Sequence, residues 1–568
     1  MEKSKKSFVK GAAVLGIAGL IVKIIGAIYR IPLTNILLKD GMKYHTTAYA
    51  YYSWLLVIAS AGLPTAISKL VSEKVAIGDK KGATDIFRTA LRLLLIIGII
   101  TSLFIFALSG PLAKLSNQPA AKYSLMALAP SLLIVSIMCA YRGYLQGMQM
   151  MTGTAVSQVT EQVGKLIAGY GLASLFKHLY PESPHFWAMG ALIGISISEL
   201  LALIVIYIFY LKNRKKLPSY GIEHGYYDRS IFSSVSKSLL VIAIPITIGA
   251  SIMSITSIAD SIFINRILES RYLGMGLVQE TAKEWADEAY VALRAYVTPL
   301  INMPAVLTLA LSMSLVPAIA PMVAARNRTG VRKAASTGMK LAMLVGAPCA
   351  AGLFVLGAPI MAMLYHEVAA STEVYSIGGF IGRIIKIGPE NPVSAYTLSG
   401  GIMQISAIGV LFLSLVQTMT GIIQGMGKQR VPVFFLVIGV ILKIVSMILL
   451  MKYTSLGIIG AAISTVLCYM LAGIGDTVFT VKRARIDLNF FDTFGKPLIS
   501  AALMGVCVYL TYNAIYKLGH PTIATFGGVC VGVVVYIACL WVLRAFNKDD
   551  MGFMPGGRRL AKIFRVND

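Results

Sequence analysis

Two cations lie in the first apolar segment, residues 11–38, where a membrane-spanning helix usually has none. They share one helical face with three glycines, because the five residues follow one another at spacings of three and four: Gly16, Gly19, Lys23, Gly26 and Arg30. A charge at the bilayer centre costs roughly 2.5 kcal/mol or more and nearly always faces protein or water. The glycines allow another backbone or a ligand to approach. This stripe predicts one wall of an internal path for an anionic substrate; the alternative is helix packing, with both cations reaching the membrane surface.

Other ionisable residues lie in later apolar segments. Asp260 corresponds to Arg30, and the two could form a salt bridge that locks one conformation or binds the cations when substrate is absent. Glu161 and Lys165 are four residues apart, so we expect them to neutralise each other. Lys443 has no acid on its own segment. Arg142 is expected to reach the cytoplasmic interface.

We therefore assign two groups of candidate site residues. Substrate binding is assigned to Lys23, Arg30, Asp260, Lys165 and Lys443. Coupling or gating is assigned to a second group, Glu161, Glu199 and Asp476, of which the last two lie on corresponding segments.

Composition indicates a polytopic membrane protein. The 568 residues are 57% hydrophobic and 13% charged, and the mean hydropathy is +0.75. The formal net charge of +26 comes from 51 Lys and Arg against 25 Asp and Glu. The basic loops lack interleaved aromatic residues or a known binding motif, so nucleic-acid binding is not supported. The surplus instead fits a surface facing anionic membrane lipids.

The hydropathy pattern predicts an all-α protein with 14 transmembrane helices. The expected spans are 11–38, 46–71, 89–113, 121–145, 155–176, 186–211, 238–265, 295–325, 341–364, 399–425, 431–451, 455–480, 497–516 and 522–543. An even number places both termini on one side of the membrane. Most Lys and Arg outside the spans lie in the loops on that side, which predicts cytoplasmic termini.

An internal repeat divides the chain. The fourth span ends with Arg142-Gly-Tyr-Leu-Gln-Gly-Met148 and the tenth with Thr420-Gly-Ile-Ile-Gln-Gly-Met426. Leu63-Pro64 similarly matches Val316-Pro317. We expect two six-helix parallel repeats followed by an extra pair of helices, with an N-lobe at 1–225, a C-lobe at 226–485, and spans 13–14 with a cytoplasmic tail at 486–568. Parallel repeats of this kind are typical of transporters that bind substrate between their halves and alternate access.

Signatures of catalysis and of cofactor binding are missing from the sequence. It has no nucleotide-binding Gly-x-x-x-x-Gly-Lys-Ser/Thr loop and no His-Glu-x-x-His or Gly-x-Ser-x-Gly motif. The six histidines fall outside the expected spans, and the six cysteines form no Cys-x-x-Cys pair. We expect no enzyme activity, no cofactor and no metal site. Transport would then be driven by an ion gradient, by the membrane potential or by removal of product. The coupling ion could be Na⁺ or H⁺.

Three stretches near the N-terminus resemble a known family. They are Phe8-Val-Lys-Gly-Ala-Ala, Gly19-Leu-Ile-Val-Lys-Ile-Ile-Gly-Ala-Ile-Tyr-Arg-Ile-Pro32 and Ala61-Gly-Leu-Pro-Thr-Ala-Ile-Ser-Lys-Leu-Val-Ser-Glu73. They are similar to the polysaccharide-transporter branch of the multidrug/oligosaccharidyl-lipid/polysaccharide (MOP) exporters, above all to its stage V sporulation protein B and MurJ-type flippases of Gram-positive bacteria. The resemblance implies a V-shaped pair of lobes around a cationic cavity. It also implies that basic residues of the first span, here Lys23 and Arg30, line that cavity and that the last two spans form a groove for a lipid tail.

Chemistry and resemblance agree on a flippase for a polyprenyl-pyrophosphate-linked sugar, with lipid II, the peptidoglycan precursor, as the leading substrate. A flippase for another lipid-linked polysaccharide unit and a multidrug (MATE) exporter are alternatives. Organic cations, however, would favour an acidic cavity over Lys23 and Arg30. A membrane enzyme such as a glycan polymerase is a third alternative. We expect a multi-pass protein of the bacterial plasma membrane that functions as a monomer near cell-wall synthesis enzymes.

Overall fold

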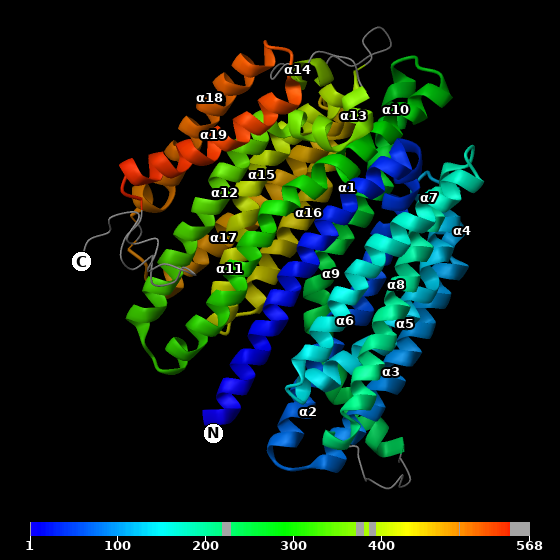
Figure 1. Ribbon diagram of the computed structural model, residues 1–568, viewed down its shortest axis with the longest axis vertical. Helices are drawn as coiled ribbons and strands as arrows, with labels where there is room; N and C mark the ends of the chain where they lie inside the picture. Colours follow the sequence, from blue (N-terminus) through cyan, green and yellow to red (C-terminus); the bar gives the residue numbers. More distant parts are fainter. Residues whose placement is uncertain (1, 218–228, 371–379, 386–392, 488, 546–568) are drawn as a thin grey trace. The chain divides into compact units, whose positions relative to one another are not determined.

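The computed structural model describes residues 2–217, 229–370, 380–385, 393–487 and 489–545, and every regular element among them is a helix (Figure 1). Twelve helices in this part of the chain are long and apolar enough to cross a membrane. The chain divides into two compact units, residues 1–263 and 264–568. The tail expected after the last span lies largely outside the described residues.

The first unit contains eleven helical elements, counting α9, which continues into the second. Their bounds are α1 (Glu2–Ser60), α2 (Leu63–Ala76), α3 (Lys80–Ala107), α4 (Ser109–Leu115), α5 (Ala121–Gly147), α6 (Met151–Gly164), η1 (Lys165–Gly169), α7 (Tyr170–Leu179), α8 (Pro184–Lys212), η2 (Arg214–Lys216) and α9 (Arg229–Gly274).

Helix α1 contains the first expected span and the larger part of the second. Its helical geometry fails at Leu38, which has φ 55° and ψ −175°, a conformation that L-residues rarely adopt. Figure 1 shows the chain turning back, so that the N-terminus and α2 lie at the same end. The break falls where the hydropathy pattern ends the first span. The 16–76 segment therefore counts as one of the twelve candidate helices, although two spans were expected there.

Two of the expected spans are each built from more than one helical element. The second, residues 46–71, is broken between α1 and α2. A Cβ at Gly62 in this break would overlap the Ala243 carbonyl oxygen and the Thr247 hydroxyl of α9, so glycine is required there by close packing. The fifth, residues 155–176, is helical throughout as α6, the π-helix η1 and α7, but it is not among the twelve candidates.

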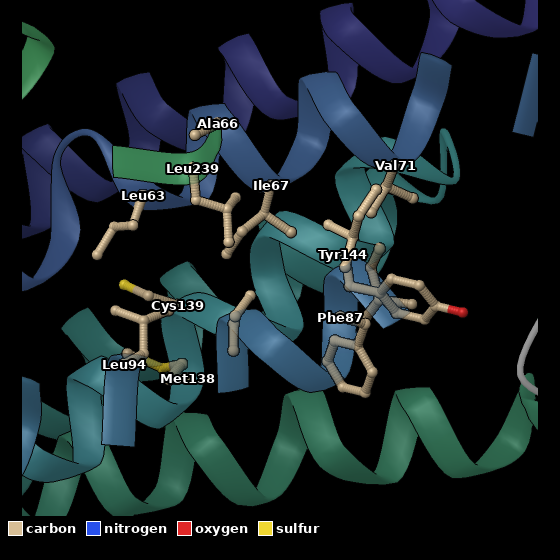
Figure 2. Close-up of a cluster of buried hydrophobic side chains, with 14 of the residues drawn as sticks. Leu63, Ala66, Ile67, Val71, Phe87, Leu94, Met138, Cys139, Tyr144 and Leu239 are labelled. Carbon is tan, nitrogen blue, oxygen red and sulfur yellow. The ribbon is translucent and has the colours of Figure 1, made fainter. Parts of the chain in front are cut away.

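A buried apolar cluster joins α2, α3, α5, α8 and α9 in the first unit. Figure 2 shows Ile67 of α2 and Leu239 of α9 side by side, with Phe87 of α3 against Tyr144 of α5. The rings of Phe87 and Tyr144 are stacked with centroids 4.3 Å apart. The first half of α9 therefore belongs to the core of the first unit.

The second unit is built from α10 (Gln279–Val291), η3 (Ala292–Val297), α11 (Thr298–Ala324), α12 (Arg328–Leu364), α13 (His366–Ala370), α14 (Phe380–Ile385), α15 (Ala395–Gly425), α16 (Arg430–Tyr453), α17 (Ile458–Ala484), η4 (Phe491–Gly495), α18 (Lys496–Tyr516) and α19 (Pro521–Val542). An ion cluster fastens the last two helices to α12. Asp492 of η4 lies 2.7 Å from the Lys340 ammonium and 2.6 Å from that of Lys496. Tyr536 of α19 donates a hydrogen bond to the Leu344 carbonyl oxygen of α12 (2.9 Å).

Corresponding packing contacts occur in both units. Two glycines near the end of α5, Gly143 and Gly147, lie against the carbonyl oxygens of Pro64 and Ser68. In the second unit the glycines of the matching motif near the end of α15 lie in the same way against carbonyl oxygens of α11: Gly421 against Ser312 and Gly425 against Val316.

Helix starts and helix crossings match as well. Asp79 caps α3 by accepting a hydrogen bond from the Gly82 N–H (2.7 Å), and Asn327 caps α12 through the Gly330 N–H (2.9 Å). A close crossing also recurs, in which a glycine faces a serine: Gly98 faces Ser136, and Gly346 faces Ser414. By these contacts, the residue of the second unit that corresponds to Pro64 is Ser312. It lies more than one helical turn before Pro317, the residue that sequence matching aligns with Pro64.

Replacement of Gly62 by Ala should destabilise the first unit. The added Cβ would meet the backbone of α9, which cannot move away as a flexible side chain can. We expect a loss of about 1–3 kcal/mol, as for other overpacked sites, measured as a lower thermal unfolding temperature in detergent. The control is Gly16→Ala, whose Cβ would have no neighbour within 4 Å and should be neutral or stabilising. Equal effects of the two substitutions would contradict the packing role of Gly62.

Candidate functional site

The glycine and cation stripe lies on the first half of α1. The Lys23 side chain is exposed and that of Arg30 is half-buried. A Cβ added at Gly16 or Gly19 would meet no neighbour within 4 Å, whereas one at Gly26 would contact the Gln162 side chain of α6. The stripe is therefore open near the N-terminus and becomes enclosed toward Arg30.

A cluster of four charged side chains, each at most 14% exposed, lies within the first unit. The Lys165 ammonium, on η1, lies 2.7 Å from Oε1 of Glu161 and 3.0 Å from Oε1 of Glu199 on α8. Arg142 of α5 donates to Oε2 of Glu161 (3.1 Å) and to the Ser157 hydroxyl (2.7 Å). Two cations and two anions make the cluster neutral in sum, which is what burial in an apolar protein requires. We call these four residues the charge cluster.

The local backbone explains how the charge cluster forms. Gly164 packs on Ser198 of α8, and Gly169 at the end of η1 lies against Gly194, so η1 and α8 approach closely. This approach places Glu199, only 1% exposed, beside Lys165. The π-helical turn begins at Lys165; such turns are frequent at functional sites.

The predicted Glu161–Lys165 pair is confirmed, but the structure adds two partners. Glu199 binds Lys165 directly, and Arg142 binds Glu161. The guanidinium of Arg142 donates to Glu161 and Ser157, and the position at the cytoplasmic interface stays a prediction. Sequence spacing cannot show these contacts because both residues come from other helices. Lys165 also has carboxylate partners on two sides, so its charge is already compensated.

The remaining candidates are all buried, on three different helices. Asp260 of α9 is 3% exposed, and Lys443 of α16 is also 3% exposed. Asp476 of α17 is 1% exposed, and neither of its carboxylate oxygens has a hydrogen-bond partner in the described part of the chain. One turn earlier, Gly473 packs on the Phe412 carbonyl oxygen of α15. A buried carboxylate in such a place requires a proton or a cation as partner.

His45 is a residue whose position the sequence did not predict. The hydropathy pattern places it between the first two spans, and in the structure it lies in the second half of α1 and is 2% exposed. Its ring stacks on Tyr49 with centroids 5.9 Å apart. The described residues form no group of three or more His, Cys, Asp or Glu that could hold a metal ion.

An apolar groove of about 630 Å³ lies in the second unit. It is lined by α12, α15 and α18, with Phe354, Ile408 and Tyr509 among its larger side chains. The resemblance implies a tail groove on the last two spans; α18 contributes to this groove, and α19 supplies none of its lining residues.

Comparison with known families identifies the chain. Residues 8–323, more than half of the sequence, match the model described as "Polysaccharide biosynthesis protein". The chain belongs to this family. Residues 281–449 also match the MatE model.

Curated relatives of the family align along nearly the whole length. Stage V sporulation protein B of Bacillus subtilis (strain 168) is 24% identical over 559 residues, covering 97% of this chain and 98% of the relative. Lipid II flippase MurJ of the same organism is 25% identical over 579 residues, covering 98% of each.

Solved structures of the MOP superfamily share the fold. Lipid II flippase MurJ in an inward closed conformation aligns with a TM-score of 0.63 and 13% identity, covering 94% of this chain and 98% of that one. An inward-facing multidrug resistance MATE family transporter aligns with a TM-score of 0.55 and 16% identity, covering 81% and 98%. The protein therefore has the all-helical membrane fold shared by MurJ and MATE transporters.

Removal of the Lys165 charge should destabilise the protein strongly. Lys165→Met leaves Glu199 buried beside no cation, which typically costs about 3–5 kcal/mol. Adding Glu199→Gln should recover part of this loss, because the uncompensated charge is then gone. Thermal unfolding of the single and double variants measures both effects.

The matched control is the exposed pair Lys69–Glu73, whose ammonium and carboxylate are 3.9 Å apart with both side chains more than half exposed. Lys69→Met should cost less than about 1 kcal/mol. A Lys165→Met variant as stable as Lys69→Met would contradict the structural importance of the charge cluster.

Proposed function

We propose that the protein is a flippase that moves lipid II from the inner to the outer leaflet by alternating access. The observation that carries the proposal is the open, cationic and glycine-rich face of α1 in a chain of this family. Pyrophosphate is anionic, and its oxygens suit the planar fork of Arg30 and the exposed ammonium of Lys23. Asp260 would hold these cations when substrate is absent.

The architecture proposed for this function has 14 spans in two six-helix halves and an appended pair. The corresponding helix caps and glycine contacts of the two units support an internal duplication. The 12 candidate helices are compatible with 14 spans, because α1 turns at Leu38 and the α6–η1–α7 segment is helical but not counted. The groove between α12, α15 and α18 would seat the polyprenyl tail.

Several further roles belong to the same proposal. Lys443 and Lys165 are assigned to the substrate path, although the latter acts within the charge cluster. Glu161, Glu199 and Asp476 are assigned to coupling or gating, and the buried, unpartnered carboxylate of Asp476 supports a proton or Na⁺ there. We infer a monomeric, non-enzymatic plasma-membrane protein with cytoplasmic termini that acts near cell-wall synthesis enzymes and contacts anionic lipids.

The match of residues 281–449 to MatE favours a multidrug exporter as the second candidate. The two functions differ in the charge of the substrate. Competition of transport by lipid II supports the flippase, and competition by a cationic dye supports the exporter. If another lipid-linked glycan inhibits transport better than lipid II does, the protein is still a flippase, but its substrate is that glycan.

Replacement of Arg30 tests the flippase proposal directly. Arg30→Ala should leave a folded protein that binds lipid II roughly ten- to a hundredfold more weakly, since a hydrogen bond to a charged group contributes about 1.5–3 kcal/mol. Arg30→Lys should recover part of the affinity, because a point charge replaces a bidentate fork. Lipid II binding and thermal stability are measured together. Unchanged binding in a stable Arg30→Ala protein would remove Arg30 from the substrate site.

Cysteine labelling tests the orientation and hence the direction of transport. In a background lacking the six native cysteines, a membrane-impermeant reagent added to whole cells should label Lys283→Cys in α10. It should not label Lys215→Cys in η2, which follows the proposed sixth span on the cytoplasmic side. Permeabilised cells, in which both positions should react, provide the control. The reverse pattern would invert the topology.

A further inference from the structure

A second apolar groove, of about 660 Å³, lies within the first unit. It is lined by the first half of α1, by α6 and η1, and by Leu201 of α8. None of the lining residues is charged, and all except Thr160 are aliphatic residues or glycine. On α1 the lining residues, Ile17 and Ile21 among them, lie on the helix face opposite the glycine and cation stripe. The groove is therefore separate from the face that the flippase proposal assigns to pyrophosphate.

The groove has the length of a single lipid chain. Along α6 and η1 its lining extends from Ala155 to Ala168, which at 1.5 Å per residue is about 20 Å. One leaflet contributes about 15 Å of hydrocarbon, half of the roughly 30 Å core of a bilayer. Any flat membrane-facing surface meets lipid, but a chain that lies in a groove contacts protein on several sides and gains more dispersion energy. The groove is thus suited to hold one acyl chain.

Helices α1 and α6 run in the same direction along the groove. Position 26 of α1 lies against the Gln162 side chain of α6, and Tyr29, three residues later, lies against Gly169 at the end of η1. The residues of α1 that precede the groove therefore lie at the same end as the start of α6.

This end of the groove is rich in cations. Residues 2–10 of α1 contain four lysines and a single acid, Glu2. Three of the lysines, Lys3, Lys6 and Lys10, continue at spacings of three and four the helical row that enters the groove at Val14. The face of α1 that lines the groove thus carries lysine positions immediately before the groove begins.

Helix α8 adds positive charge at the same end. Gly153, near the start of α6, faces Phe209, near the end of α8. The end of α8 and the η2 turn that follows it therefore lie beside the start of α6, and they carry three exposed cations, Lys212, Arg214 and Lys215. An apolar groove that ends among cations is complementary to an amphiphile with an apolar chain and an anionic head.

We propose that this groove binds an acyl chain of an anionic phospholipid, whose phosphate lies among the lysines that precede Val14. Lysines at the membrane surface attract anionic lipids, and the adjoining groove holds the chain of the same molecule. The inference gives a site to the contact with anionic lipids proposed above. It rests on that part of the proposed function and not on the identity of the transported substrate.

A chain in the groove also covers the backbone of the charge cluster. Gly164 and Ile167 line the groove on either side of Lys165, and Leu201 lies two residues after Glu199. The chain would therefore keep water away from the π-helical turn and its ion pairs. Because a ligand that binds the folded state stabilises it, the anionic lipid should raise the thermal stability of the protein.

Thermal unfolding in detergent tests the site. The probe is dioleoyl phosphatidylglycerol, and the reference is dioleoyl phosphatidylcholine, which has the same chains and a zwitterionic head. Phosphatidylglycerol should raise the unfolding temperature of the wild type to a plateau, and phosphatidylcholine should raise it much less.

Two variants fill the groove from different helices. Val156→Trp on α6 and Ile17→Trp on α1 each replace an exposed lining residue, so the lipid-free protein should keep its unfolding temperature. Each variant should lose the response to phosphatidylglycerol. The matched control is Val445→Trp on α16, which is 50% exposed against 49% for Val156 and does not line the groove. It should respond as the wild type does.

Removal of the lysines tests the headgroup. Together, Lys3→Gln, Lys6→Gln and Lys10→Gln should weaken the binding of phosphatidylglycerol roughly tenfold or more, since one lysine near anionic lipid contributes up to about fivefold. Affinity is measured from the lipid concentration that gives half of the temperature increase. A control that removes the same charge from exposed positions of α2 and α3 should leave the affinity unchanged: Lys69→Gln, Lys80→Gln and Lys81→Gln.

The outcomes separate this inference from the flippase proposal. Equal stabilisation by the two lipids, or a response to phosphatidylglycerol that both groove variants retain, would overturn the inference. A response that lipid II or Arg30→Ala abolishes would also overturn it, because the phospholipid would then occupy the proposed pyrophosphate site. A wild-type protein that responds to phosphatidylglycerol but does not bind lipid II would overturn the flippase proposal alone.

Discussion

A charge placed inside an apolar protein must be neutralised from within that protein, and this constraint organises the first unit. Lys165 can be buried because Glu161 and Glu199 bind it from two helices, and Glu161 can be buried because Arg142 completes its coordination. The glycines that bring η1 and α8 together are part of the same solution, since the ion pair requires their close approach. In this unit, therefore, the compensation of the charges depends on the close packing of the helices.

The sequence predicts the features that depend on local spacing. Hydropathy ends the first span at 38, where the backbone breaks at Leu38, and a four-residue spacing pairs Glu161 with Lys165. It does not predict contacts between distant segments. Arg142 and Glu199 reach the charge cluster from other helices, and the need for glycine at position 62 comes from the close passage of α9. These features follow from tertiary packing, which a periodic pattern does not encode.

The register of the proposed internal repeat shows a related limit of residue matching. Matching identical residues pairs Pro64 with Pro317, whereas backbone contacts pair Pro64 with Ser312. The caps explain why the contacts are the better guide. Asp79 and Asn327 are different residues, but both accept a hydrogen bond from the N–H three residues later and so begin a helix at the corresponding point. Chemical equivalence at a helix start is thus preserved where residue identity is not.

The two cations of the glycine stripe on α1, Lys23 and Arg30, differ in environment in a way that suits their chemistry. The exposed Lys23 carries a strongly hydrated ammonium, which burial would penalise, whereas the half-buried Arg30 carries a more weakly hydrated guanidinium with a fixed fork of donors. Because the charge cluster cancels its own charges, it adds no net charge beside this face. An anion approaching from the open end would meet Lys23 first and lose its water only at Arg30. Under the proposed function, long-range attraction and directional binding would be divided between these two residues of one helix.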